Sequence, residues 1–232
     1  MDGLSIRRRI ALDIARSMRK SQEEEHPLRQ LFWECTLRCN LRCQHCGSDC
    51  KQVAATPDMP KEDFFKVLDS IAAKTDPHKV FVIISGGEPT MRADLEECGK
   101  GIYSRGFPWG MVTNGFGMTA ERFSRLLGAG LHSMTVSLDG LEENHDWLRG
   151  REGSFTRAAE TIRMALRSGI AFDVVTCVNR RNYLQLPQLK EFLIGLGLKE
   201  WRLFSIFPQG RAALNPDLQL PPEMFRGMLD FI

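Results

Sequence analysis

Short apolar runs alternate with amphipathic stretches along most of the chain, and this alternation predicts its secondary structure. The apolar runs predict strands at 28–36, 79–84, 109–113, 132–138, 171–178 and 199–206. Between them, apolar residues at helical spacing predict helices at about 58–72, 93–104, 119–127, 154–168 and 184–196. Thr119 and Ser154 are predicted helix caps, and the polar stretch before Gly153 is predicted to be a loop. Strands that alternate with helices in this way indicate βαβ units and a parallel sheet.

Polar residues directly follow five of the predicted strands. In a curved parallel sheet, the carboxyl ends of the strands meet at one face and form the site. We therefore expect an α/β fold with the sheet curved into a partial barrel and the functional residues at that face. An open doubly wound sheet is the alternative architecture.

The two ends of the chain are predicted to differ from its middle. Residues 1–27 predict a basic amphipathic helix, with Ile10, Ile14 and Met18 on one side, and a polar linker. We expect this helix to dock on the barrel or on a partner; binding to a membrane surface is a further alternative that we do not favour. Residues 28–215 form the predicted core. Residues 216–232 resemble the start of a helix that is cut short, which indicates a truncated C-terminal extension.

Composition excludes several classes of protein. With 232 residues, 43% of them hydrophobic and 26% charged, the chain has the size of one α/β domain. A net charge of +2 gives no electrostatic reason to expect a nucleic acid partner. No apolar run approaches the ~20 residues of a membrane span. Seven cysteines in a chain of this size, several of them closely spaced, indicate metal binding in a reducing compartment, and we expect the cytoplasm.

Three of these cysteines, Cys39, Cys43 and Cys46, lie within eight residues at the spacing Cys-x3-Cys-x2-Cys. Cysteine thiolates are the usual ligands of a [4Fe–4S] cluster, which has four irons. Three thiolates therefore leave one iron open, and an open position is typical of a metal site that binds a small molecule.

A zinc knuckle is the alternative interpretation of the same cysteines. In that case His45, Cys35 or Cys50 would supply the fourth ligand. Otherwise we interpret Cys35 and Cys50 as inert buried thiols. Only Cys98 and Cys177 lie beyond residue 50, which is too few for a second cluster.

A second motif, Ser-Gly-Gly-Glu-Pro at 85–89, ends the second predicted strand. Gly86 and Gly87 allow a ligand to approach the backbone closely and permit positive φ. Pro89 biases Glu88 toward an extended conformation, which fixes the direction of its carboxylate. A simple turn between strand and helix is the alternative interpretation.

The cysteine spacing and the Gly-Gly-Glu-Pro motif together resemble the radical S-adenosylmethionine (SAM) superfamily. The resemblance covers about residues 28–215 and implies a (β/α)6 partial TIM barrel. It also implies a [4Fe–4S] cluster whose open iron binds SAM, and an electron donor such as flavodoxin or ferredoxin. One electron then cleaves SAM and releases a 5′-deoxyadenosyl radical, which takes a hydrogen atom from the substrate.

The resemblance also assigns residues that contact SAM. Gly86, Gly87 and Glu88 would meet its amino group. Ser137 and Asp139, which share one face of the fourth strand, would suit its carboxylate and ribose, although Asp139 could instead orient the following loop. Further contacts would come from Arg149, through an ion pair with the SAM carboxylate, and from Asn179, near the adenosyl group or, equally, in an Asx turn.

The segments from Asp139 to Phe155 and from Pro208 to Ala212 resemble peptide-modifying members of the SPASM type and sulfatase-maturase relatives. Those relatives usually carry a cysteine-rich C-terminal extension with auxiliary clusters, which this sequence lacks. We expect a peptide or protein substrate. The alternatives are a tetrapyrrole or another small metabolite, or a non-catalytic module that binds zinc or a cluster.

Overall fold

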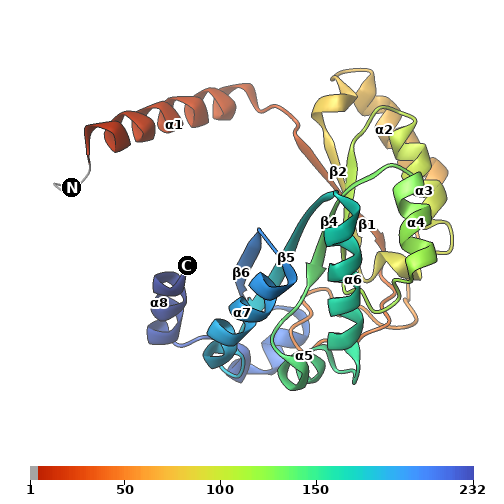
Figure 1. Ribbon diagram of the computed structural model, residues 1–232. Helices are drawn as coiled ribbons and strands as arrows, with labels where there is room; N and C mark the ends of the chain where they lie inside the picture. Colours follow the sequence, from red (N-terminus) through yellow and green to blue (C-terminus); the bar gives the residue numbers. More distant parts are fainter. Residues whose placement is uncertain (1–4) are drawn as a thin grey trace.

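A computed structural model describes residues 5–232 (Figure 1), and all six predicted strands are present in this range. Neighbouring strands are parallel, and their order in the sheet is β1-β2-β3-β4-β5-β6. A doubly wound sheet reverses its strand order at a switch point, so the sequential order excludes that alternative. The strands are β1 Gln30–Thr36, β2 Phe81–Gly86, β3 Trp109–Thr113, β4 Leu131–Ser137, β5 Ala171–Val178 and β6 Trp201–Ser205.

Helices connect the strands and cover the outer face of the sheet, where α2, α3, α4 and α6 are seen in Figure 1. Strand residues such as Val82, Ile84, Met134 and Val136 are fully buried in one core cluster with side chains of these helices. The helices are α1 Ile6–Glu25, α2 Lys61–Ala72, α3 Leu95–Tyr103, α4 Ala120–Gly128, α5 Glu142–Arg149, α6 Ser154–Ser168, α7 Leu186–Leu196 and α8 Pro222–Phe231. Short 3-10 helices lie at Pro77–Lys79, Pro89–Met91, Tyr183–Gln185, Gly210–Leu214 and Pro216–Leu218.

Helix α5 lies where the sequence predicted a polar loop, so that prediction was wrong. Its first turn is acidic, its last turn is basic, and Gly150 ends it in the left-handed conformation with φ 67°. The helix has little apolar periodicity because its buried residues include Asn144, His145 and Arg149. Its buried face is polar because it borders the candidate site.

The two predicted helix caps differ in outcome. The Thr119 hydroxyl accepts a hydrogen bond of 3.1 Å from the backbone of the first turn of α4, as predicted. Ser154 does not cap α6, because Gly153 occupies the cap position. Instead, Asp146 of α5 accepts hydrogen bonds from the backbone N–H groups of Gly153 and Phe155, at 2.6 and 2.7 Å. This cap fixes α5 against the start of α6.

Helix α1 forms as predicted but does not dock on the barrel. Its stripe of apolar side chains is open to solvent, with Ile10, Ile14 and Met18 exposed by 54%, 55% and 60%. In Figure 1 the helix extends away from the sheet. The expected contact with the barrel is therefore wrong, whereas contact with a partner stays a prediction; residues 1–4 of the predicted segment lie outside the described residues.

At the other end, helix α8 packs on the core through Met228, which joins a small apolar cluster with Val178 and Leu186. Within residues 5–232, no helix is both long and apolar enough to cross a membrane.

Candidate functional site

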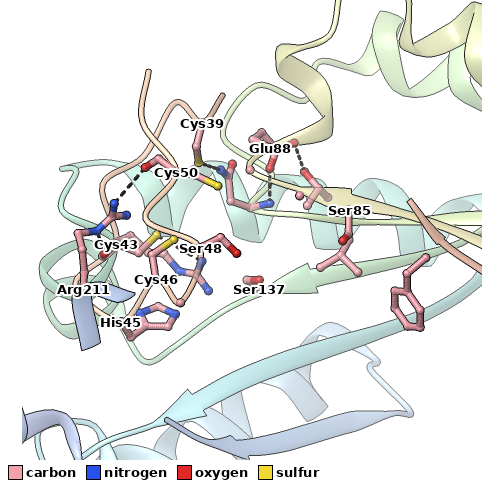
Figure 2. Close-up of a pocket in the computed structure, with 18 residues that line it drawn as sticks. Cys39, Cys43, His45, Cys46, Ser48, Cys50, Ser85, Glu88, Ser137 and Arg211 are labelled. Carbon is pink, nitrogen blue, oxygen red and sulfur yellow. Dashed lines mark hydrogen bonds between the residues drawn. The ribbon is translucent and has the colours of Figure 1, made fainter. Parts of the chain in front are cut away.

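The three predicted cluster ligands lie in the segment 37–51, here called the cysteine loop, which directly follows β1. Cys39 and Cys43 are 8% exposed and Cys46 is half-buried. All three line one pocket of about 340 Å³ at the carboxyl ends of the strands (Figure 2). The structure thus brings together the thiols that a cluster requires.

Segments distant in sequence hold the cysteine loop in place. The Gln44 N–H donates to the Leu148 carbonyl of α5 at 2.8 Å. Arg211, beyond β6, donates its backbone N–H to the Cys46 carbonyl at 2.9 Å and its Nε to the Cys43 carbonyl at 2.7 Å. These bonds use protein groups alone, so they hold the loop without help from a bound metal.

Burial favours the protonated thiol at Cys39 and Cys43. It raises the pKa of Cys39 to about 12, and it also raises the pKa of Cys43. Iron binds the thiolate, so cluster assembly must release these protons. Arg149 opposes the effect of burial on the pKa of Cys43, because its NH1 lies 3.6 Å from the Cys43 Sγ. The guanidinium therefore favours the thiolate that iron requires.

The glycines of the second motif allow two segments of backbone to approach each other. A Cβ on Gly86, whose φ is 116°, would lie 2.4 Å from the Thr36 carbonyl oxygen. One on Gly87 would lie 2.2 Å from the Arg38 carbonyl oxygen. The Gly87 and Glu88 N–H groups donate to these two carbonyls at 2.7 and 2.9 Å. The sequence predicted close approach of a ligand; in the structure it is the entry to the cysteine loop that comes close to these glycines.

Glu88 is 1% exposed and points to the pocket from the end of β2. Its carboxylate accepts hydrogen bonds from the Thr113 hydroxyl at 2.7 Å and from the Asn114 N–H at 2.7 Å. The Thr90 hydroxyl and N–H also donate to it, at 2.8 and 3.1 Å. All of these donors are neutral. The carboxylate is thus firmly oriented, but no cation among the described residues pairs with its charge.

Asp139 and Arg149 form a buried ion pair, with 2.6 Å between Oδ2 and NH2. Burial alone would raise the pKa of Asp139, but the adjacent guanidinium holds it below its usual value. Asp139 Oδ1 also accepts the Cys177 N–H at 2.7 Å. Asp139 thus positions Arg149 and the end of β5. Arg149 and Ser137 both line the pocket, and the Arg149 Nε has no hydrogen-bond partner among the described residues.

Asn179 does not line the pocket. Its Oδ1 accepts hydrogen bonds from the N–H groups of Arg181 and Asn182, at 2.9 and 3.2 Å. This is the Asx-type turn that the sequence left as an equal interpretation. The turn directly follows β5 and fixes the chain at the end of that strand.

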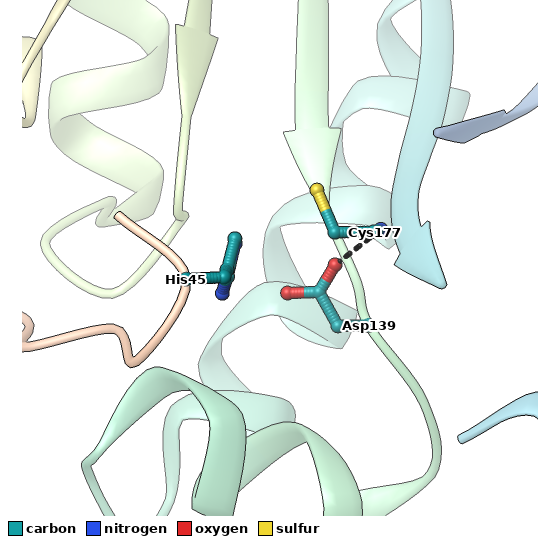
Figure 3. Close-up of side chains that lie close together, drawn as sticks. All are labelled: His45, Asp139 and Cys177. Atoms are coloured by element: carbon teal, nitrogen blue, oxygen red, sulfur yellow. Dashed lines mark hydrogen bonds between the residues drawn. The ribbon is translucent and has the colours of Figure 1, made fainter. Parts of the chain in front are cut away.

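Figure 3 shows His45, Asp139 and Cys177, whose potential ligand atoms lie within 4.8 Å of one another. Their spacing would suit a metal ion, but Arg149 already pairs with the carboxylate. Burial raises the pKa of Cys177 to about 12 and lowers that of His45 to about 4, so the thiol and the ring are both neutral near pH 7. We therefore interpret this group as a polar wall beside the cysteine loop and not as a second metal centre.

Sequence reasoning did not predict several contacts of this site. Thr113 and Asn114 fix Glu88, and the Asn114 Nδ2 also lies 3.9 Å from the Cys39 Sγ. Their position at the end of a strand was the available signal. Arg211 lies 168 residues after Cys43, and nothing in the local pattern links it to the cysteine loop.

A profile of the Radical SAM superfamily matches residues 33–193, more than half of the chain. The Fe-coproporphyrin III synthase of Methanosarcina barkeri is 30% identical over 204 residues, which are 87% of this chain and 50% of that protein. The PqqA peptide cyclase of Rhizobium meliloti is 26% identical over 196 residues, 84% of this chain and 52% of that protein. The chain thus spans about half the length of these curated relatives.

Among solved structures, SuiB of Streptococcus suis bound to S-adenosylmethionine matches with a TM-score of 0.70 and 16% identity. The match covers 100% of this chain and 55% of SuiB. At this identity it concerns the fold alone, and it confirms the predicted partial barrel.

Proposed function

Because the chain belongs to the radical SAM superfamily, we propose that Cys39, Cys43 and Cys46 hold a [4Fe–4S] cluster and that the adjoining pocket binds SAM. When bound, the cluster supplies the electron that cleaves SAM to a 5′-deoxyadenosyl radical. One observation supports the proposal above the others: three thiols and the carboxylate of Glu88 line the same pocket. The thiols suit iron, and the carboxylate suits an ammonium group.

The pocket residues divide the binding of SAM between them. Glu88 offers a negative charge that only neutral groups contact, so an ammonium group would supply the missing cation. Gly86 and Gly87 line the pocket beside Glu88, so their backbone lies next to the site proposed for that group. Arg149 lines the pocket and brings a buried positive charge to it, which suits the SAM carboxylate. Ser137 adds a hydroxyl for the carboxylate or the ribose.

Asp139 and Asn179 would act indirectly, by positioning other parts of the site. Asp139 orients Arg149 through their ion pair, and Asn179 closes the turn after β5. Neither residue needs to touch SAM for the pocket to have its shape.

The reaction we propose is removal of a hydrogen atom from a peptide or protein substrate. The likeness of the 139–155 segment to peptide-modifying members and the 26% identity to a peptide cyclase support this class. A tetrapyrrole is the second candidate, because the relative with 30% identity is named as an Fe-coproporphyrin III synthase. Flavodoxin or ferredoxin would donate the electron, in the reducing cytoplasm that such a cluster requires.

Anaerobic reconstitution of the full chain tests the cofactor proposal. We expect about four irons and four sulfides per chain, which is the composition of one [4Fe–4S] cluster. We also expect 5′-deoxyadenosine to form from SAM with dithionite as reductant. Alanine variants of Cys39, Cys43 and Cys46 should lose both, while Cys98→Ala, which removes a core thiol, should keep both. One zinc and no sulfide in the unmodified chain would instead support the zinc module.

Supplying candidate substrates to the reconstituted enzyme separates the two substrate classes. If the substrate is a peptide, the reconstituted enzyme should modify a short peptide that is encoded by a neighbouring gene. It should not modify an iron porphyrin. Modification of the porphyrin alone would favour the second candidate and contradict the first.

A further inference from the structure

We propose that Cys50 is a fourth, exchangeable thiolate ligand of the cluster. It binds the open iron in the absence of SAM, and SAM replaces it. The inference rests on the function proposed above and goes beyond it, because the three-cysteine motif leaves Cys50 out.

Cys50 lies inside the candidate site. It is 4% exposed and belongs to the same small buried cluster as Cys39, Cys43 and the half-buried Cys46. All four line the same pocket, and in Figure 2 the Cys50 side chain lies beside that of Cys39. In the sequence the spacing extends to Cys-x3-Cys-x2-Cys-x3-Cys, and we interpreted Cys50 there as an inert buried thiol or, in a zinc knuckle, as a possible fourth ligand.

The remaining cysteines show what an inert buried thiol looks like in this chain. Cys35 and Cys98 are 1% and 0% exposed, and both belong to the main apolar core between sheet and helices. Neither lines the pocket. Cys50 shares their burial but not their surroundings, because its neighbours are the cluster ligands.

The protein holds Cys50 in this position from both sides. Arg211 NH1 donates to the Cys50 carbonyl at 3.0 Å and to the Asp49 carboxylate at 2.7 Å. Asp49 itself has φ 47°, a left-handed conformation that residues with side chains rarely adopt. On the other side, the Lys51 carbonyl accepts the Cys39 N–H at 2.8 Å. These contacts keep the backbone of Cys50 next to the first cluster ligand.

The proposed exchange is a change of ligand with no change of oxidation state. The Cys50 thiol releases its proton when its sulfur bonds to the open iron. When the amino and carboxylate groups of SAM take that position, the iron–sulfur bond breaks and the thiolate can regain a proton. With Cys50 bound, the open iron has a protein ligand and resists loss under oxidation, which would otherwise leave a [3Fe–4S] cluster.

Comparison of Cys50→Ala with Cys98→Ala, both reconstituted as full chains, tests the proposal. Cys98→Ala is the matched control because it removes a buried thiol far from the pocket. Both variants should bind the same iron and sulfide as the unmodified chain. Without SAM, ferricyanide should convert several-fold more of the Cys50→Ala cluster to the [3Fe–4S] form, measured by EPR. Since SAM no longer has to displace a ligand, its dissociation constant for Cys50→Ala should fall by about 10-fold.

Mössbauer spectroscopy of the unmodified chain provides a test that needs no variant. Without SAM, all four irons should have sulfur-only coordination, and SAM should convert one of them to a site with oxygen and nitrogen ligands. A distinct iron with oxygen ligands before SAM is added would overturn the proposal. So would oxidation and SAM binding in Cys50→Ala that match those of Cys98→Ala. If the unmodified chain assembles no cluster, the function proposed above fails instead.

Discussion

Replacement of Gly87 by alanine tests whether the glycine pair holds the entry of the cysteine loop against the end of β2. A Cβ at this position would lie 2.2 Å from the carbonyl oxygen and 2.7 Å from the carbonyl carbon of Arg38. Real Cβ atoms keep at least 3.0 Å, so the two segments must separate by about 0.8 Å, the difference between 3.0 and 2.2. Both atoms of Arg38 belong to the backbone, and no rotation of a side chain relieves the clash.

The separation should break the two hydrogen bonds that join these segments. They run from the Gly87 N–H to the Thr36 carbonyl at 2.7 Å and from the Glu88 N–H to the Arg38 carbonyl at 2.9 Å. Each such bond contributes about 1 kcal/mol, and a buried group left without a partner costs about 1–3 kcal/mol. We therefore expect Gly87→Ala to lower the free energy of unfolding by roughly 2–4 kcal/mol.

Urea unfolding of the cluster-free chain under reducing conditions measures this loss, and iron content after reconstitution measures its effect on the site. Gly47→Ala is the control because Gly47 lies in the cysteine loop and a Cβ there would meet no atom within 4 Å. It should change the free energy of unfolding by less than about 0.5 kcal/mol. A Gly87→Ala chain as stable as the unmodified one would refute the reasoning, and so would a Gly47→Ala chain that loses as much stability.

Two further predictions concern the surroundings of the site, and a third concerns helix α1. Arg149→Met should lower the free energy of unfolding by about 3–5 kcal/mol, because it leaves Asp139 buried without its partner. The double variant with Asp139→Asn should recover part of this free energy, as measured by urea unfolding. If the double variant recovers none of it, the stabilising role of the ion pair is contradicted. Burial lowers the pKa of His145 from 6.5 to about 4, so its contribution to stability is complete above pH 6.5 and is lost as the pH falls toward 4. His145→Asn should therefore flatten the dependence of unfolding free energy on pH between about 4.5 and 7 by up to ~3 kcal/mol, and an unchanged slope would contradict the burial effect. Deletion of residues 1–25 should shift the Tm by less than ~2 °C, because the apolar stripe of α1 is exposed; a larger drop in thermal denaturation would mean that this helix docks on the core.

Local patterns were sufficient to predict the strands and to single out three cysteines that line one pocket in the structure. The apolar run at 79–84 indicates a strand, and the structure places β2 at Phe81–Gly86. Cys39, Cys43 and Cys46 are neighbours along the chain, so connectivity alone keeps their sulfur atoms near one another. The residues of the Gly-Gly-Glu-Pro motif are also neighbours along the chain, so the local pattern is sufficient to place them together at the end of β2.

Contacts between segments distant in sequence were not predictable in this way. The pairing of Arg149 with Asp139 depends on how α5 packs beside β4, and α5 itself was missed because polar residues fill its buried face. The cap of α6 comes from Asp146 and not from Ser154, a choice that only the angle between two helices decides. The exposed stripe of α1 shows the converse: an amphipathic pattern predicts a helix but does not say which surface covers it.

The way the cysteine loop is held bears on the choice between a cluster and a zinc knuckle. A small zinc module gains its fold from its metal and is unfolded without it. Here the loop is fixed by backbone hydrogen bonds from three separate places: the end of β2 at Gly87 and Glu88, helix α5 at Leu148, and Arg211 beyond β6. Folding of the barrel therefore orders the ligands, and its free energy already offsets the conformational entropy that they lose. The order of the loop thus comes from the barrel and not from a bound metal, which favours a cluster-binding loop over a zinc knuckle.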